Sequence, residues 1–79
     1  MRVTTWNVNG LRAALRKGFE RHLEAIAPDV LLLQEVRARP EQLPDGWAEP
    51  DGWHAAWHPA ERPGYSGVAV WSTQQSLAE

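Results

Sequence analysis

A continuous apolar run, "DVLLLQEV" at residues 29–36, constrains the fold more than any other feature of this sequence. Pro28 and Asp29 are turn signals at its start, and the polar residues Gln34 and Glu35 follow its apolar part. A short apolar run bounded in this way is typical of a strand that is buried on both faces. The sequence therefore favours an α/β fold in which this segment is a buried strand.

A first strand is predicted at the start of the chain. Residues 2–7, "RVTTWN", alternate in polarity and are rich in β-forming side chains, so we expect a strand that ends near Asn7. Asn9 is then a candidate N-cap for a helix, and Gly10 eases the turn into it. Together with residues 29–36 this predicts a β–α–β unit, whose strands run parallel and whose crossover is right-handed.

The segment between the two strands has helical periodicity. Apolar residues recur three or four positions apart, at Leu11, Leu15, Phe19, Leu23 and Ile26. Gly18 interrupts this pattern. The segment is therefore either one helix, or a short helical turn followed by a second helix from Phe19 to about Ala27.

The second half of the chain has weaker patterns. Residues 37–52 hold three prolines and two glycines, which indicates a long irregular connection on the surface. Residues 53–58, "WHAAWH", and 68–72, "VAVWS", are candidate strands that would form an antiparallel pair. Residues 73–79 show no usable pattern, and the chain has no internal repeat.

Composition narrows the functional classes. A chain of 79 residues holds at most one small domain, and the lack of cysteine excludes a disulfide framework or a cysteine-based zinc site. No apolar run approaches the roughly 20 residues that a membrane span needs, and the first residues are too polar for a secretory signal. We therefore expect a cytoplasmic protein with no membrane partner.

The net charge of −2 is divided unevenly along the chain. Residues 1–39 carry seven basic and four acidic side chains, whereas residues 40–79 carry one basic and six acidic ones. A basic half can favour a phosphate-bearing partner even in an acidic protein. The alternative is a solvated, charged helix surface, and charge alone favours that alternative.

Polar side chains gather where the two predicted strands end. Asn7 and Asn9 follow the first strand, and Gln34 and Glu35 end the second. Because parallel strands point their carboxyl ends to one edge of a sheet, where open α/β sheets bind ligands, we expect these side chains to converge. Hard oxygen ligands of this kind suit Mg²⁺, with Mn²⁺ as a substitute. One interpretation is therefore part of a metal site, in which the asparagines align a phosphate or a metal-bound water.

The same residues also have a structural interpretation. Glu35 could pair with Arg37 or Arg39, and the two asparagines could serve only the turn. Since single motifs of this kind are common by chance, the residues alone favour the structural interpretation.

Basic residues follow the same edge of the sheet. Arg12, Arg16 and Lys17 lie at the start of the helical segment, where they are placed to meet phosphates. Their alternative is an exposed, solvated turn, and taken alone these residues favour it.

Other residue types that often carry chemistry point to structure here. His54 and His58 would meet only on a helix, and their segment is predicted as a strand; His22 is expected at the surface of a helix. The sequence contains no serine in a nucleophile elbow and no glycine-rich phosphate loop. Five tryptophans are expected to pack in the core and loops rather than to stack on bases: Trp6, Trp47, Trp53, Trp57 and Trp71.

Three segments together resemble a known family. "WNVNGLRAA" at 6–14, "PDVLLLQEV" at 28–36 and "GYSGVAVWS" at 64–72 are similar, in order and spacing, to the N-terminal third of exonuclease III and the related abasic-site endonucleases. These enzymes belong to the endonuclease/exonuclease/phosphatase superfamily. The resemblance implies the N-terminal part of a four-layer, DNase I-like α/β sandwich. It also implies Mg²⁺-dependent hydrolysis of duplex DNA, 5′ to an abasic site or from a 3′ end.

The resemblance also implies roles for individual residues. Glu35 matches the metal-binding glutamate of the family, and Asn7 matches the active-site asparagine near metal and phosphate. Asn9 stands where some relatives place an aspartate, and it is expected to contact DNA. Arg12 and Lys17 match positions that approach the DNA backbone. Tyr65 matches a tyrosine that contacts DNA.

Several parts of the family's site have no counterpart in the sequence. These are an active-site tyrosine, an Asp-x-Asn pair and a late Asp-His. We therefore expect residues 1–79 to form an incomplete N-terminal portion of the domain, inactive alone, with an exposed apolar sheet face. The intact enzyme is expected to be a monomer. The alternatives are a truncated module that binds DNA or a partner without catalysis, and another phosphodiesterase of the superfamily.

Overall fold

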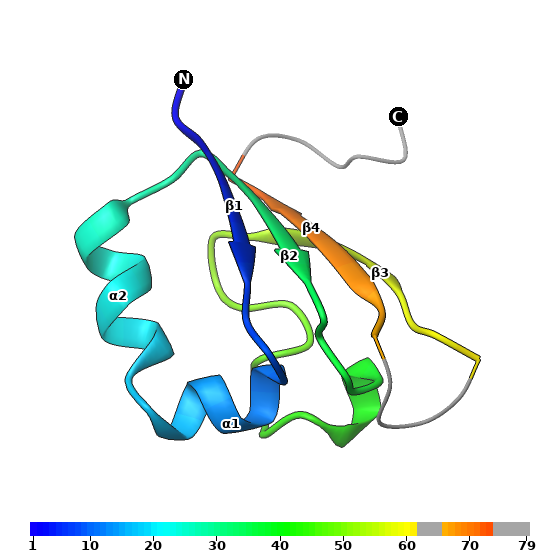
Figure 1. Ribbon diagram of the computed structural model, residues 1–79. Helices are drawn as coiled ribbons and strands as arrows, with labels where there is room; N and C mark the ends of the chain where they lie inside the picture. The colour runs from blue at the N-terminus through cyan, green and yellow to red at the C-terminus, as the bar shows by residue number, and fades with distance from the viewer. Residues whose placement is uncertain (62–65, 74–79) are drawn as a thin grey trace.

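The computed structural model describes residues 1–61 and 66–73, which build a four-stranded sheet with its helices to one side (Figure 1). Its elements in chain order are β1 (Val3–Asn7), α1 (Leu11–Arg16), α2 (Phe19–Ile26), β2 (Val30–Gln34), a 3₁₀ turn η1 (Pro40–Gln42), β3 (His54–His58) and β4 (Val68–Ser72). Within the described ranges, neither helix has the length and apolar character that crossing a membrane would require.

The sheet has the order β1–β2–β4–β3 and confirms the predicted strands. β1 and β2 are parallel, with Val3 opposite Val30 and Asn7 opposite Gln34, as the β–α–β prediction requires. β3 and β4 form the predicted antiparallel pair. The sequence did not indicate that β4 also pairs with β2 and so lies inside the sheet.

The helical segment is divided, as the second of the two alternatives predicts. Gly18 has a φ of 97°, a left-handed conformation that glycine adopts readily, and it separates α1 from α2. The predicted cap at Asn9 is wrong, because Gly10 occupies the N-cap position and no side chain caps α1. Asn9 itself has a φ of 48°, which an asparagine tolerates better than most residues.

The covered face of the sheet carries the core. It is formed by alternate residues of the four strands that point toward the helices: Thr4, Trp6, Leu31, Leu33, Ala55, Trp57, Ala69 and Trp71. Trp71 is fully buried, and the rings of Phe19, Trp53 and Trp57 each lie 5.9 Å from it between centroids. Phe19 of α2 also stacks on Trp6 at 4.8 Å. Aromatic packing of this density is expected to supply most of the stability of so small a domain.

The connection between β2 and β3 is irregular, as predicted, but it is not confined to the surface. Leu43 is buried in the core, and Trp47 stacks on Trp71 with centroids 6.2 Å apart. The indole Nε1 of Trp57 donates a hydrogen bond to the backbone oxygen of Ala48, at 2.7 Å. The apolar residues of this connection complete the covered face, so the prediction that the tryptophans serve packing is confirmed.

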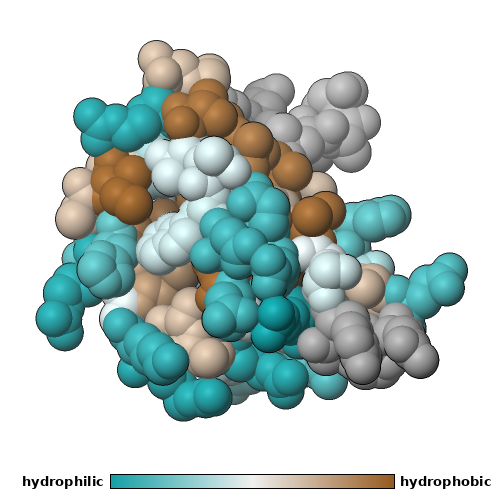
Figure 2. Space-filling view, viewed as in Figure 1, coloured by the Kyte–Doolittle hydropathy of each residue, from teal (hydrophilic) through white to brown (hydrophobic). Residues whose placement is uncertain are grey.

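The opposite, uncovered face of the sheet has no described helix against it (Figure 1). Apolar and polar residues share it: Val3, Thr5, Asn7, Val30, Leu32, Gln34, His54, Ala56, His58, Val68, Val70 and Ser72, of which Ser72 is buried. Val3 is 57% exposed and Val68 is 46% exposed. The prediction that β2 is buried on both faces is therefore wrong, because Leu31 and Leu33 are buried whereas Leu32 is only half-buried. Hydrophobic side chains reach the surface in the upper part of Figure 2, and hydrophilic ones dominate the lower part, toward which β1 and β2 point.

Candidate functional site

The carboxyl ends of β1 and β2 are joined by backbone hydrogen bonds that continue past the strands. The N–H groups of Val8 and Gly10 donate to the carbonyl oxygens of Gln34 and Glu35, at 3.1 and 2.8 Å. The next N–H group, that of Leu11 at the start of α1, donates to the Val36 carbonyl at 2.8 Å. The turn into α1 is therefore fixed directly against the turn that carries Glu35.

The turn after β2 has an unusual backbone that is held from its other side. Glu35 and Arg37 have φ angles of 52° and 57°, in the left-handed region that residues other than glycine seldom adopt. The N–H groups of Val36 and Arg37 donate to the carbonyl oxygens of Gly67 and Ser66, at 3.1 and 2.9 Å. Local strain of this kind persists where surrounding structure enforces it, and such positions cluster at functional sites.

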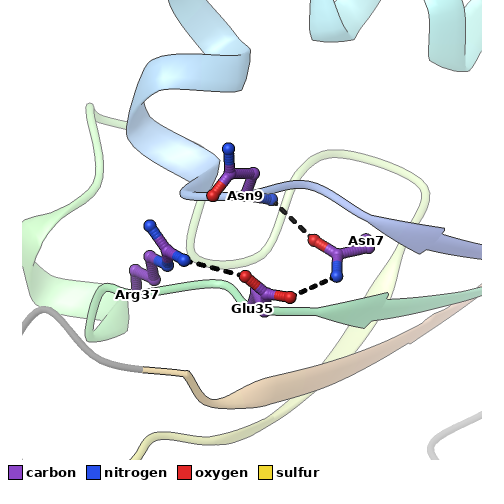
Figure 3. Close-up of polar contacts among 4 residues, drawn as sticks. All are labelled: Asn7, Asn9, Glu35 and Arg37. Carbon is purple, nitrogen blue, oxygen red and sulfur yellow. Dashed lines mark hydrogen bonds and ion pairs between the residues drawn. The ribbon is translucent and has the colours of Figure 1, made fainter.

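The side chains of Asn7, Glu35 and Arg37 converge at this edge, as the sequence predicts for Asn7 and Glu35, whereas Asn9 takes part through its backbone and its side chain points away (Figure 3). The amide Nδ2 of Asn7 donates a short hydrogen bond to Oε2 of Glu35. The guanidinium of Arg37 donates to Oε1 of the same carboxylate at 2.8 Å. The backbone N–H of Asn9 donates to Oδ1 of Asn7 at 3.0 Å, which fixes the orientation of that amide. Both oxygens of Glu35 are therefore engaged by donors.

The hydrogen bonds favour the charged form of Glu35. The pKa of this carboxyl is lowered from its ordinary value, chiefly by the hydrogen bond from Asn7. Partial desolvation opposes this shift, and the hydrogen bond and positive charge of Arg37 add to it. The side chain of Glu35 is 38% exposed, so the carboxylate is charged and still accessible from solvent.

The donor set suits a hard divalent cation. Glu35 offers carboxylate oxygens, the ligand type that Mg²⁺ prefers. Asn7 turns its Nδ2 toward Glu35 and its Oδ1 toward the Asn9 N–H, so in this arrangement it orients the carboxylate. Among residues 1–61 and 66–73, no group of three or more histidine, aspartate or glutamate side chains could hold a metal. Mg²⁺ commonly binds through one or two carboxylates and takes its other ligands from water and phosphate, so the residues present fit such an ion.

A basic groove opens beside the carboxylate. It has a volume of about 360 Å³ and is lined by Asn9, Gly10, Arg12, Ala13, Arg16 and Arg37. A second groove, of about 540 Å³, shares Arg12 and Arg16 and runs between α1 and the connection that carries Leu43 and Trp47. The two arginines of α1 therefore border both hollows next to the site.

Of the other residues predicted to contact DNA, the structure places only some beside the basic groove. Arg12 lies in the basic groove with Asn9, as expected for a shared ligand surface. Lys17 is exposed at the C-cap of α1 and does not line that groove. Tyr65 lies outside the described residues. His54 and His58 sit at the two ends of β3, and exposed His22 packs edge-on to Trp6, so none of the histidines joins the site.

Arg37 is the site residue that sequence reasoning undervalued. Its position two residues after Glu35 suggested a structural ion pair, and that pair is present. The pattern did not reveal that the same guanidinium also lines the basic groove. A basic residue at this offset from a strand-end carboxylate was the available signal, but only the left-handed turn brings it back toward the strand edge.

Comparison with known families identifies a clear match. The sequence profile described as the Endonuclease/Exonuclease/phosphatase family matches residues 4–75. An exodeoxyribonuclease of Bacillus subtilis is 40% identical over 78 residues, which cover 98% of this chain and 30% of that protein. The DNA repair nuclease APEX1 of Danio rerio is 40% identical over 72 residues, which cover 89% of this chain and 23% of that protein. The chain thus spans less than a third of the length of these relatives.

Solved structures agree with the sequence matches. The Neisseria 3′ phosphatase NExo, solved with a product DNA hairpin, superposes with a TM-score of 0.75 and 35% identity over 95% of this chain and 28% of its own. The catalytic domain of Xenopus laevis APE2 gives 0.73 and 32%, over 91% and 23%. These likenesses confirm the predicted fold class and the resemblance to exonuclease III and abasic-site endonucleases.

Proposed function

Since the chain belongs to the Endonuclease/Exonuclease/phosphatase family, we propose that it is the N-terminal portion of a DNA-repair nuclease of the exonuclease III type. The intact enzyme would act as a monomer on duplex DNA, at abasic sites or at 3′ ends. One observation carries this proposal: Glu35 and Asn7 converge at the carboxyl edge of the sheet, beside a groove lined by arginines. This is the edge at which α/β sheets bind their ligands.

We assign Mg²⁺, with Mn²⁺ as a substitute, to Glu35. Asn7 is proposed as a second ligand on the resemblance alone, since its Oδ1 accepts a hydrogen bond from the Asn9 N–H. When bound, such a cation stabilises negative charge on a phosphate and on the leaving oxygen. The chain's own part is to hold the carboxylate charged and oriented, through the amide of Asn7 and, before a cation binds, through the guanidinium of Arg37. The hydrogen bond from Asn9 keeps the amide of Asn7 in one orientation, so that its Nδ2 faces Glu35.

The DNA backbone is assigned to the basic side of the same edge. Arg12 lines the groove next to Asn9, and its guanidinium suits phosphate oxygens. Lys17 and Tyr65 are proposed as further DNA contacts on the resemblance alone, Lys17 from the far end of α1. We expect the 79 residues alone to be inactive, because they bring one carboxylate to the described part of the site.

A chimaeric enzyme tests the proposal. This chain would replace the matched segment of the Bacillus exodeoxyribonuclease, and cleavage of a labelled duplex with one abasic site would be measured in Mg²⁺. The chimaera is expected to cut, and Glu35→Gln is expected to lower the rate by at least about 100-fold. Glu41→Gln, at an exposed position of η1, is the matched control and should leave the rate unchanged.

The result also separates the alternatives. A folded chimaera that binds the duplex and does not cut it would favour a non-catalytic DNA-binding module. Cleavage of RNA or of a small phosphodiester in preference to DNA would instead favour another phosphodiesterase of the superfamily.

A further inference from the structure

The guanidinium of Arg37 belongs to two sites at once. It donates to Oε1 of Glu35 at 2.8 Å, and it forms part of the lining of the basic groove with Arg12 and Arg16. Its side chain is 44% exposed, and within the described residues its guanidinium pairs with Glu35. One positive charge is thus placed between a carboxylate and a groove suited to phosphate.

A cation at Glu35 would compete with Arg37. Asn7 donates to Oε2 of Glu35 and Arg37 donates to Oε1, so a cation can reach Oε1 only in competition with Arg37. Two positive charges within a few ångströms of each other repel. Binding of a cation therefore favours a conformation in which the guanidinium has left Oε1.

The backbone limits where Arg37 can go. Its N–H is bonded to the Ser66 carbonyl at 2.9 Å, and its left-handed φ is part of the fixed turn, so only the side chain is free to move. The groove that it already lines is the adjacent open volume. There it would join Arg12 and Arg16, whose side chains make no hydrogen bond or ion pair with any described residue.

Three arginines around one groove have a definite ligand chemistry. Each planar guanidinium group can donate two parallel hydrogen bonds to a phosphate. The three positive charges repel one another until an anion enters the groove. A phosphodiester of duplex DNA in the groove would stabilise Arg37 away from Glu35, and so leave Oε1 free for the cation.

We propose that Arg37 couples divalent-cation binding at Glu35 to binding of the DNA backbone in the groove of Arg12 and Arg16. The inference rests on the proposed function, because it takes the cation and the DNA from there. By thermodynamic linkage the coupling is reciprocal: DNA raises the affinity for the cation by the same factor as the cation raises the affinity for DNA.

The test measures binding, with no need for cleavage. Mg²⁺ would be titrated calorimetrically into the full chain, with and without a saturating short DNA duplex, at fixed ionic strength because DNA binding depends on salt. The ratio of the two Mg²⁺ affinities is the coupling factor, and a gel confirms that the DNA stays intact. Arg39→Gln is the matched control, because it removes an exposed arginine nearby that does not line the groove.

Arg37→Gln has a distinctive expected result. Without DNA, its affinity for Mg²⁺ should rise about two- to five-fold, since a competing surface ion pair is lost. Its coupling factor should fall at least about two-fold from a wild-type value of about five or more, and its affinity for DNA should fall too. A merely structural role would instead lower the Mg²⁺ affinity. If Arg37→Gln fails to fold by circular dichroism, Arg37→Lys should shift both quantities in the same directions by less.

The other outcomes overturn the inference. If the wild-type chain binds Mg²⁺ and DNA and Arg37→Gln leaves the coupling factor unchanged, Arg37 is not the coupling residue, while the proposed function stands. If the folded wild-type chain binds neither Mg²⁺ nor DNA, the assignment of both ligands to these residues fails together with the inference.

Discussion

The two faces of the sheet differ in what supports them. The covered face is packed with aromatic rings, and its central residues Leu33 and Trp71 are 1% and 0% exposed. The uncovered face alternates with it residue by residue along the same strands, yet its apolar side chains remain partly accessible in the described structure. Asn7, at the carboxyl end of β1, lies on the uncovered face by the same alternation.

The residues that stabilise the fold and the residues that form the candidate site therefore lie in different parts of the sheet. Packing against α2 and the β2–β3 connection fixes the strands from one side, so the other side is free to present polar groups at its end. The carboxyl edge is then ordered by hydrogen bonds rather than by burial, as the Asn7–Glu35–Arg37 network shows (Figure 3). Changes on the covered face should therefore alter folding, and changes at the edge of the uncovered face should alter ligand chemistry.

The largest expected effect comes from the centre of the covered face. Phe19→Ala removes a ring that is 1% exposed and contacts Trp6, Trp47 and Trp71. We expect the free energy of unfolding to fall by about 3–5 kcal/mol, through lost transfer energy and the cavity left behind. Urea denaturation monitored by tryptophan fluorescence measures it. A loss of less than about 1 kcal/mol would show that the aromatic cluster is not the stabilising core.

A matched pair of leucines compares the two faces directly. Leu33→Ala empties a buried position and is expected to cost about 2–5 kcal/mol of unfolding free energy. Leu32→Ala, on the adjacent residue and the uncovered face, is expected to cost less than half as much, because its side chain already meets solvent. Both values come from the same urea titrations. Equal losses would mean that another part of the protein covers Leu32 in solution.

The contrast between the faces was only partly readable from the sequence. The apolar run at Leu31 to Leu33 correctly identified a strand, but it also suggested burial on both sides. A continuous apolar run predicts a strand with apolar side chains on both faces. It does not predict which other segments pack against each face. Likewise, the prolines of residues 37–52 marked a loop, while the inward packing of Trp47 depends on contacts far along the chain.

The candidate site was predictable because its position follows from topology. Parallel strands bring Asn7 and Glu35 to one edge whatever the side chains, so their order in the sequence was enough. The cap at Asn9 was predicted wrongly because its side chain was expected to serve the helix. Instead its backbone bonds to Asn7. The double contact of Arg37 could not be predicted, since it depends on a left-handed φ that the sequence does not signal at an arginine.

The smallest expected effect tests whether the edge of the uncovered face is independent of the core. Because the pKa of Glu35 is lowered chiefly by the hydrogen bond from Asn7, Asn7→Ala should raise that pKa toward the ordinary glutamate value, and by more than Arg37→Gln does. The change in pKa is measured by following the NMR signal of the Glu35 carboxyl carbon through a pH titration. In the wild type the carboxylate stabilises the fold above its unfolded-state pKa, and this contribution is lost as pH falls through the lower folded-state pKa. In Asn7→Ala the interval between the folded-state and unfolded-state pKa of Glu35 should narrow, because Arg37 remains. Urea denaturation at neutral pH should show a far smaller loss than that of Phe19→Ala. A loss as large as that of Phe19→Ala would mean that the edge and the core form one cooperative unit, and that the separation of chemistry from stability between the two faces is false.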